Sequence, residues 1–243
     1  MDKKRLDLYQ LENGYCYNSD SLFLYHFIKR FLKNDIKLLD IGTGCGVLGL
    51  LCARDFKIKL SLSEINDTMA KIALINAKKN NIACDMIVGN ILESGLESSK
   101  EKFDFIISNP PFYRKDIIDS KNKFIFLARQ SENLPLHLLL KFVKSILKPN
   151  GTFIFCYDAK EIKNVFNAIS DTNFNVDEMA FVYPKVSKNA NLVMIKCKIS
   201  KSQTKILAPL YNFIDKEHSN EAKEIFRLCN TFSIKVSNLE QIL

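Results

Sequence analysis

The chain has 243 residues, of which 47% are hydrophobic and 26% are charged, as in a soluble globular protein with one α/β core. The net charge is +8, but lysines greatly outnumber arginines, so charge alone does not indicate a nucleic-acid partner. No apolar run is long enough to cross a bilayer, and the start Met1–Arg5 leads into no signal-like stretch, so we expect a cytoplasmic protein.

Cysteine and histidine placement argues against a metal site. The seven cysteines are scattered without a C-x-x-C pair, which excludes the usual zinc and disulfide patterns, and we expect most of them to be buried. His26, His137 and His218 have no metal-like partner three or four residues on. We therefore predict no metal.

The first 35 residues are predicted to form a lead-in, with Ser19, Asp20 and Ser21 capping an amphipathic helix over 22–32. A strand over 36–41 follows, then the glycine loop Gly42-Thr43-Gly44-Cys45-Gly46 and a helix over 47–54. Strand, glycine loop and helix form a nucleotide site at the carboxyl edge of a parallel sheet.

Polar residues at the ends of three predicted strands favour one particular nucleotide ligand. Asp40 ends the first strand, where a carboxylate suits an ammonium and repels a pyrophosphate, which argues against NAD. Glu64 ends the strand over 58–63 and suits ribose hydroxyls, and Asn90 follows the strand over 85–88, where an adenine edge can be read. An ammonium, a ribose and an adenine together describe S-adenosylmethionine. The alternative is that Asp40 and Glu64 are simply solvated strand ends.

The apolar run 103–108 is predicted to be a central strand, and Asn109-Pro110-Pro111-Phe112 follows it directly. Two prolines hold the strand end extended and remove N–H groups that would bind its carbonyls. The Asn109 amide oxygen and the Pro110 carbonyl then form fixed acceptors beside the flat face of Phe112, which suits a planar group bearing an NH2. The alternative is a plain Asn-Pro turn.

Basic and aromatic residues alternate just after this motif, in a pattern that suits a nucleic-acid backbone with stacking platforms. The alternative is a solvated surface loop. The predicted RNA-binding residues are Arg114, Lys115, Lys121, Lys123 and Arg129.

The remaining pattern alternates helices with strands and contains no internal repeat. Helices are predicted over 67–79, 133–147, 159–170 and 219–229. Strands are predicted over 152–157, 176–183 and 192–199.

These motifs resemble those of class I S-adenosylmethionine-dependent methyltransferases that act on planar nitrogens. The stretch from Gln10 to Ser21, together with Leu192-Val193-Met194-Ile195, is similar to the bacterial tRNA(Val) adenine-N6 methyltransferases, which modify the adenine 3′ of the anticodon. One departure is Asn90, where that family usually has an aspartate. The resemblance implies a Rossmann-like fold with a seven-stranded, mostly parallel sheet and an antiparallel C-terminal strand.

The resemblance also implies the organisation and the site. We expect a lead-in over 1–35, a methyltransferase domain over 36–200 and an extension over 201–243 packed on that domain. We favour a monomer as the oligomeric state. The implied catalytic residues are Asn109, Pro110 and Phe112. The implied cofactor-binding residues are Asp40, Gly42, Thr43, Gly44, Gly46, Glu64, Ile65, Asn90 and Asn109.

Four other functions stay open. A release-factor glutamine methyltransferase uses the same acceptors but carries a longer N-terminal domain, and a DNA adenine methyltransferase usually has a larger recognition segment. A guanine-N2 rRNA methyltransferase uses a similar loop. A non-catalytic RNA-binding protein with the same fold would have no reason to keep Asn109-Pro110-Pro111-Phe112 intact.

Overall fold

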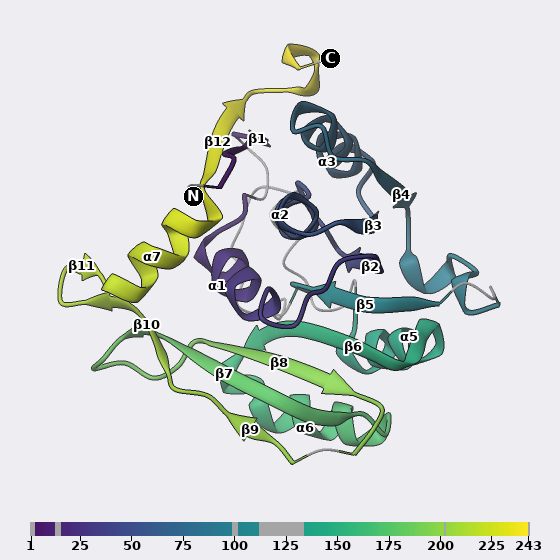
Figure 1. The fold of residues 1–243 in the computed structure, drawn as a ribbon, viewed down its shortest axis with the longest axis vertical. Helices are drawn as coiled ribbons and strands as arrows, with labels where there is room; N and C mark the ends of the chain where they lie inside the picture. Colours follow the sequence, from purple (N-terminus) through teal and green to yellow (C-terminus); the bar gives the residue numbers. More distant parts are fainter. Residues whose placement is uncertain (1–2, 13–15, 99–101, 112–133, 202, 243) are drawn as a thin grey trace.

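A computed structural model describes residues 3–12, 16–98, 102–111, 134–201 and 203–242 (Figure 1). One ten-stranded sheet organises most of them. In spatial order its strands are β11 (Glu217–His218), β10 (Leu210–Ile214), β7 (Asn175–Lys185), β8 (Leu192–Lys198), β6 (Leu147–Asp158), β5 (Phe103–Ser108), β2 (Ile36–Ile41), β3 (Ile58–Glu64) and β4 (Cys84–Val88), with β9 (Lys205–Ile206) paired to β7.

The expected seven-stranded sheet runs from β7 to the edge strand β4 of this larger sheet. Strands β4, β3, β2, β5 and β6 are parallel to one another, and β8 is antiparallel to both β6 and β7. The mostly parallel plan with an antiparallel C-terminal strand is therefore confirmed. Strands β9, β10 and β11 come from the residues after 200 and lengthen the sheet beyond β7, which the sequence pattern did not predict.

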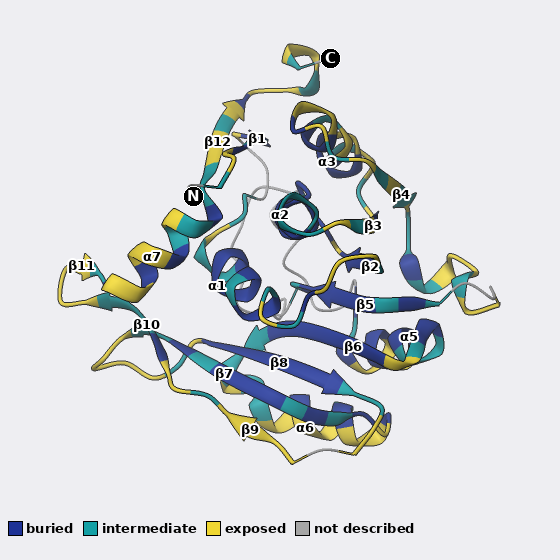
Figure 2. Cartoon of the chain, in the orientation of Figure 1, coloured by how far each residue is buried: buried dark blue, intermediate teal, exposed yellow. Residues whose placement is uncertain are grey.

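Helices cover both faces of the sheet (Figures 1 and 2). One face is covered by α1, α2, α3 and α7, and the other by α5 and α6. Their bounds are α1 (Ser19–Ile28), α2 (Val47–Asp55), α3 (Asp67–Lys79), α5 (Leu136–Ile146), α6 (Ile162–Asp171) and α7 (Asn220–Cys229).

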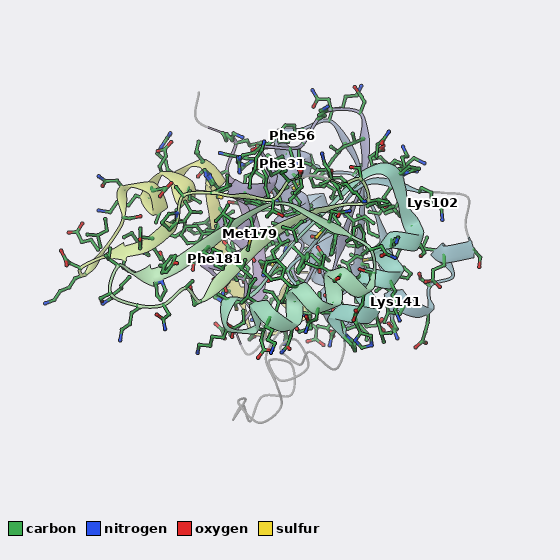
Figure 3. All side chains as sticks on the ribbon, turned by 90° about the horizontal axis from the view of Figure 1, so that it is seen from below. Phe31, Phe56, Lys102, Lys141, Met179 and Phe181 are labelled. Carbon is green, nitrogen blue, oxygen red and sulfur yellow. The ribbon has the colours of Figure 1, made fainter. Side chains whose placement is uncertain are left out.

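Alternation along the buried strands supplies two hydrophobic cores. On β6, Ile154 and Cys156 face the core of α1 and α2, whereas Phe153 and Phe155 face the core of α5 and α6. Successive strand residues point to opposite faces, and a strand covered on both faces is apolar throughout. Figure 3, viewed from below, shows the outer surface of α5, where Lys141 is exposed, while Met179 of β7 is buried.

The N-terminal region differs from the predicted lead-in. It forms a strand, β1 (Leu6–Leu11), that pairs in parallel with β12 (Thr231–Val236) in a separate two-stranded sheet. Helix α1 begins at Ser19 with Asn18 as its cap and ends at Ile28, instead of being capped by Ser19–Ser21 and reaching residue 32. A partner strand more than 200 residues away leaves no local signal, although Leu6, Leu8 and Leu11 are buried.

The other predicted elements lie where expected, with small shifts of their ends. Strand β6 begins at Leu147 instead of residue 152, and its pairing with β5 changes register between Phe103 and Phe105. The helix after residue 218 is α7, capped by Ser219. The domain boundaries at residues 35 and 200 stay a prediction.

Candidate active site

The glycine loop between β2 and α2 adopts a conformation that only glycine takes easily. Gly42, Gly44 and Gly46 have positive φ angles of 70°, 58° and 90°. A side chain at Gly42 or Gly44 would meet no atom within 4 Å, so open space lies over the backbone at these two positions. The loop therefore has room for a ligand close to its peptide groups.

Asp40 lies at the end of β2 beneath this loop and is almost completely buried. Its Oδ2 accepts hydrogen bonds from Thr43 Oγ1 at 2.6 Å and from the Gly49 N–H at 3.0 Å. Its buried Oδ1 has no hydrogen-bond partner among the described residues. Burial raises the pKa of Asp40 to about 6, and the nearby charge of Glu64 adds to the rise.

An unsatisfied buried carboxylate oxygen is costly, and a cationic ligand group would relieve it. Gly49 explains how α2 approaches so closely, since a Cβ there would lie 2.7 Å from the Leu62 side chain and 3.1 Å from Asp40 Oδ2. The spacing Gly44-x-Gly46-x-x-Gly49 thus serves loop geometry and helix packing.

Glu64 ends β3 on the other side of the loop. Its Oε2 accepts from the Gly44 N–H at 2.9 Å, and its Oε1 accepts from the Asn66 N–H at 3.0 Å. Burial raises the pKa of Glu64 despite these bonds. Each oxygen keeps a further lone pair. Beside it, Ile65 is 55% exposed and presents an apolar surface at the same edge.

Asn90 follows β4 and caps a short 3-10 helix at Ile91–Glu93. Its Oδ1 accepts from the Leu92 N–H at 3.1 Å, and its Nδ2 donates to Glu93 Oε1 at 2.6 Å. The oxygen predicted to read an adenine is therefore already bonded once, with one lone pair remaining.

Asn109 emerges beside the glycine loop. Ile41 of β2 is the register partner of Ser108 of β5, and the buried Ser108 Oγ donates to the Ile41 carbonyl at 2.8 Å. Gly42 and Asn109 follow these partners directly. The two motifs, 67 residues apart, are thus brought to the same edge of the sheet.

The Asn109 amide is held by two residues that the sequence did not indicate. Its Nδ2 donates to Ser21 Oγ of α1 at 3.2 Å, and its Oδ1 accepts from Cys156 Sγ of β6 at 3.0 Å. Burial raises the pKa of Cys156 well above its usual value, so the thiol keeps its proton and remains a donor. These contacts hold the amide between α1 and β6, with one lone pair of Oδ1 left unused. Pro110 is buried and Pro111 is half-buried.

Several predicted residues lie outside the described part of the chain. They are Phe112, Arg114, Lys115, Lys121, Lys123 and Arg129. Within the described residues, no group of three or more histidine, cysteine, aspartate or glutamate side chains is arranged to hold a metal ion.

The sequence profile of the methyltransferase small domain matches residues 18–159, more than half of the chain. This chain belongs to the methyltransferase small domain family. The match includes the glycine loop and Asn109, so the edge described above lies within the family's own segment.

A search of solved structures supports the same fold. A predicted O-methyltransferase from Agrobacterium tumefaciens matches with a TM-score of 0.67 and 14% sequence identity, over 89% of this chain and 99% of that one. Similarity at this identity extends to the fold alone, which is the Rossmann-like fold of methyltransferases.

Curated relatives match more closely in sequence. A tRNA1(Val) (adenine(37)-N6)-methyltransferase from Porphyromonas gingivalis is 33% identical over 132 residues, which is 52% of this chain and 51% of that protein. A protein of the same name from a Shewanella strain is 26% identical, over 79% of this chain and 80% of its own length. A release factor glutamine methyltransferase from Clostridium acetobutylicum is 29% identical over 59% of this chain and 54% of its own. The matched part thus spans about half the length of the first of these relatives.

Two contacts of this site had weak or no signals in the sequence. Ser21 lies 88 residues before Asn109, and nothing in its neighbourhood indicates that contact. Cys156 was expected to be a small buried residue, which it is, but it also donates a hydrogen bond.

Proposed function

We propose that this protein is an S-adenosylmethionine-dependent methyltransferase that acts on the exocyclic N6 amino group of an adenine in tRNA, the anticodon-loop adenine of tRNA(Val). One observation carries the proposal: the held amide of Asn109 lies beside the glycine loop at the carboxyl edge of the sheet. A hydrogen-bond acceptor and a cofactor loop at the same edge of the sheet suit the transfer of a methyl group to a planar nitrogen.

The residues around the loop fit S-adenosylmethionine. The unpartnered Asp40 Oδ1 suits an ammonium group, and the remaining lone pairs of Glu64 suit ribose hydroxyls. The open space over Gly42 and Gly44 and the exposed side of Ile65 leave room for the rest of the molecule. When bound, this cofactor supplies a methyl group already activated on a sulfonium.

The protein then has to position the nucleophile. An adenine NH2 is a poor nucleophile because its lone pair is delocalised into the ring. Asn109 Oδ1 and the Pro110 carbonyl would each accept one of its N–H hydrogens, which favours a pyramidal nitrogen with its lone pair free to attack. Transfer of the methyl carbon from sulfur to nitrogen, with loss of the carbon–sulfur bond, would place positive charge on the nitrogen, and the two oxygen dipoles would stabilise that charge. One N–H proton then leaves to solvent.

A neutral amino nitrogen carries a lone pair and loses its proton after transfer, so no side-chain base is needed before it. Cys156 uses one lone pair of Oδ1 and leaves the other for the substrate, while the bond to Ser21 holds the NH2 side of the amide against α1. The oxygens are therefore in place before the substrate arrives, which lowers the cost of reorganisation.

A basic and aromatic edge supports an RNA substrate. Strand β7 runs in the same direction as β6, so the loop after it lies at the same edge of the sheet as Asn109. Lys185 at the end of β7 and Lys188 in this loop are exposed, and the ring of Tyr183 in β7 lies 5.4 Å from the ring of Tyr211 in β10. Lysines bind phosphates and aromatic rings stack on bases. No described helix is long and apolar enough to cross a membrane.

The function is tested by incubating the purified protein with S-adenosylmethionine and unmodified tRNA(Val), followed by mass spectrometry of the nucleosides. N6-methyladenosine formed in proportion to enzyme supports the proposal. Because one relative is a release factor glutamine methyltransferase from Clostridium acetobutylicum, the assay must also include a release factor as a second substrate. Methylation of a glutamine in the release factor, without methylation of tRNA, would replace the proposed substrate.

A further inference from the structure

A buried asparagine connects the N-terminal strand to the glycine loop. Asn76 of α3 is completely buried, in a helix face otherwise formed by Met69, Ile72, Ala73 and Ala77. An asparagine in an apolar stripe is costly unless its amide is fully hydrogen-bonded.

The amide of Asn76 has partners for every hydrogen. Its Oδ1 accepts from the Tyr9 N–H at 2.7 Å, and its Nδ2 donates to the Tyr9 carbonyl at 3.1 Å. The second Nδ2 hydrogen goes to the Cys45 carbonyl of the glycine loop at 2.9 Å. The bonds to Tyr9 thereby fix the direction in which Asn76 donates to the loop.

One helical turn later, Asn80 makes a matching set of bonds to the same strand. Its Oδ1 accepts from the Asp7 N–H at 3.0 Å, and its Nδ2 donates to the Asp7 carbonyl at 2.8 Å and to the Asn76 carbonyl at 2.8 Å. These bonds run to β1 and to α3 itself instead of to the glycine loop. Asn80 therefore shares the strand-binding role of Asn76 and lacks its contact with Cys45.

Strand β1 is bound along both edges. Leu6 and Glu12 donate their N–H groups to the Asn230 and Val236 carbonyls, each at 2.9 Å, on the β12 side. The backbone N–H groups of Asp7 and Tyr9 point the other way and donate to the side chains of Asn80 and Asn76. The asparagine side chains thus take the place of a neighbouring strand.

The glycine loop needs such support. Three glycines at positive φ give its backbone high conformational freedom. A ligand that has to order such a loop binds more weakly because of the entropy lost on ordering. Glu64 accepts from the Gly44 N–H on one side, and Asn76 donates to the carbonyl of the following residue, Cys45, on the other. The peptide groups at the centre of the loop are held by side chains from two different elements.

We propose that Asn76 is a positioning residue through which the N-terminal strand β1 supports the cofactor loop. Cofactor affinity then depends on the docking of β1, and by reciprocity the bound cofactor stabilises that docking. The proposal rests on the proposed use of S-adenosylmethionine, and it assigns a role in that site to a residue and a strand outside it.

The test compares Asn76→Ala with the matched control Asn80→Ala. Both remove hydrogen bonds to β1, so both should lower the melting temperature. We expect only Asn76→Ala to weaken binding of S-adenosylhomocysteine, by about tenfold in calorimetry, with the affinity of Asn80→Ala within about twofold of wild type. Equal affinities for the two variants, at temperatures where both are folded, would overturn the proposal.

Hydrogen exchange of the wild-type protein tests the same proposal without relying on variants that have to fold. On adding S-adenosylhomocysteine, the Tyr9 amide, which is bonded to Asn76, should gain more protection than the Asp7 amide, which is bonded to Asn80. Equal protection of the two amides would contradict the role of Asn76. A wild-type protein that binds no S-adenosylhomocysteine would instead refute the cofactor assignment itself, so the two failures are distinguishable.

Discussion

The Asn109 Nδ2 donates to Ser21 Oγ at 3.2 Å across 88 residues of sequence, from the end of β5 to the first turn of α1. Together with the thiol of Cys156, which donates to Asn109 Oδ1, this contact holds the amide between α1 and β6. A helix outside the parallel β/α repeat thus helps to hold the proposed acceptor.

Removing these two partners should slow methyl transfer. We expect Ser21→Ala and Cys156→Ala each to lower kcat by about two- to tenfold, since one hydrogen bond contributes ~0.5–1.5 kcal/mol. The KM for tRNA should change little, because neither residue is assigned to RNA binding. Ser98→Ala, at an exposed serine, is the matched control. Steady-state kinetics in which a Ser21→Ala/Cys156→Ala double variant keeps wild-type kcat would show that the amide needs no such support.

The raised pKa of Asp40 predicts pH-dependent cofactor binding. Below about pH 6 the buried carboxyl is protonated, and an ammonium favours its charged form, so affinity for S-adenosylhomocysteine should rise as pH increases through about 6. Asp40→Asn should bind weakly and lose this part of the pH dependence. Asp85→Asn, at an exposed carboxylate, should keep it. Calorimetry from about pH 5 to about pH 7.5 gives the comparison, and an identical slope in Asp40→Asn would exclude Asp40.

The same group should affect the stability of the free protein in the opposite direction. Because its folded pKa lies above the ordinary value of 3.8, its favourable contribution is complete below that value and is lost as pH rises through about 6. The melting temperature of wild type relative to Asp40→Asn should therefore fall between these pH values. A rise in this relative melting temperature over the same pH interval would contradict the raised pKa of Asp40.

Neutralising the basic loop after β7 should weaken RNA binding without changing base choice. Phosphate contacts carry affinity, so Lys185→Ala/Lys188→Ala should lower the salt slope of tRNA binding by about 0.7 per lost contact to single-stranded RNA. The control Lys33→Ala/Lys78→Ala removes two exposed lysines. Lys33 precedes β2 and Lys78 lies in the last turn of α3, both at the opposite edge of the sheet. Equal slopes for both double variants would mean that the loop is only solvated.

Local patterns predicted the elements of the central sheet because those elements depend on local chemistry. The helix that begins at Asp67, the glycine loop and the polar end of β5 were all readable from neighbouring residues. The pairing of β1 with β12 was not, since it joins the two ends of the chain. Asn76 had a usable signal, as a polar residue in the apolar stripe of a helix, but its partners Tyr9 and Cys45 come from the tertiary fold.

The site was predicted unevenly for the same reason. Asp40 and Glu64 lie at the strand ends where β/α alternation places them, and both line the glycine loop. Asn90 was assigned to adenine recognition from its position, but its amide also caps a short helix, which position alone did not indicate. The assignments of the cofactor-binding and catalytic residues remain predictions.

Methylation by Asn109→Ala tests the central claim most directly. The variant removes the acceptor oxygen and leaves Asp40, Glu64 and the glycine loop unchanged. The resemblance also implies a cofactor contact for Asn109, but the other cofactor-binding residues remain, so we expect S-adenosylhomocysteine affinity within about twofold of wild type. Single-turnover methylation of tRNA(Val) should fall more than tenfold, a loss above ~1.4 kcal/mol in transition-state stabilisation. A variant that binds the cofactor and keeps more than about a tenth of the wild-type rate would contradict the account.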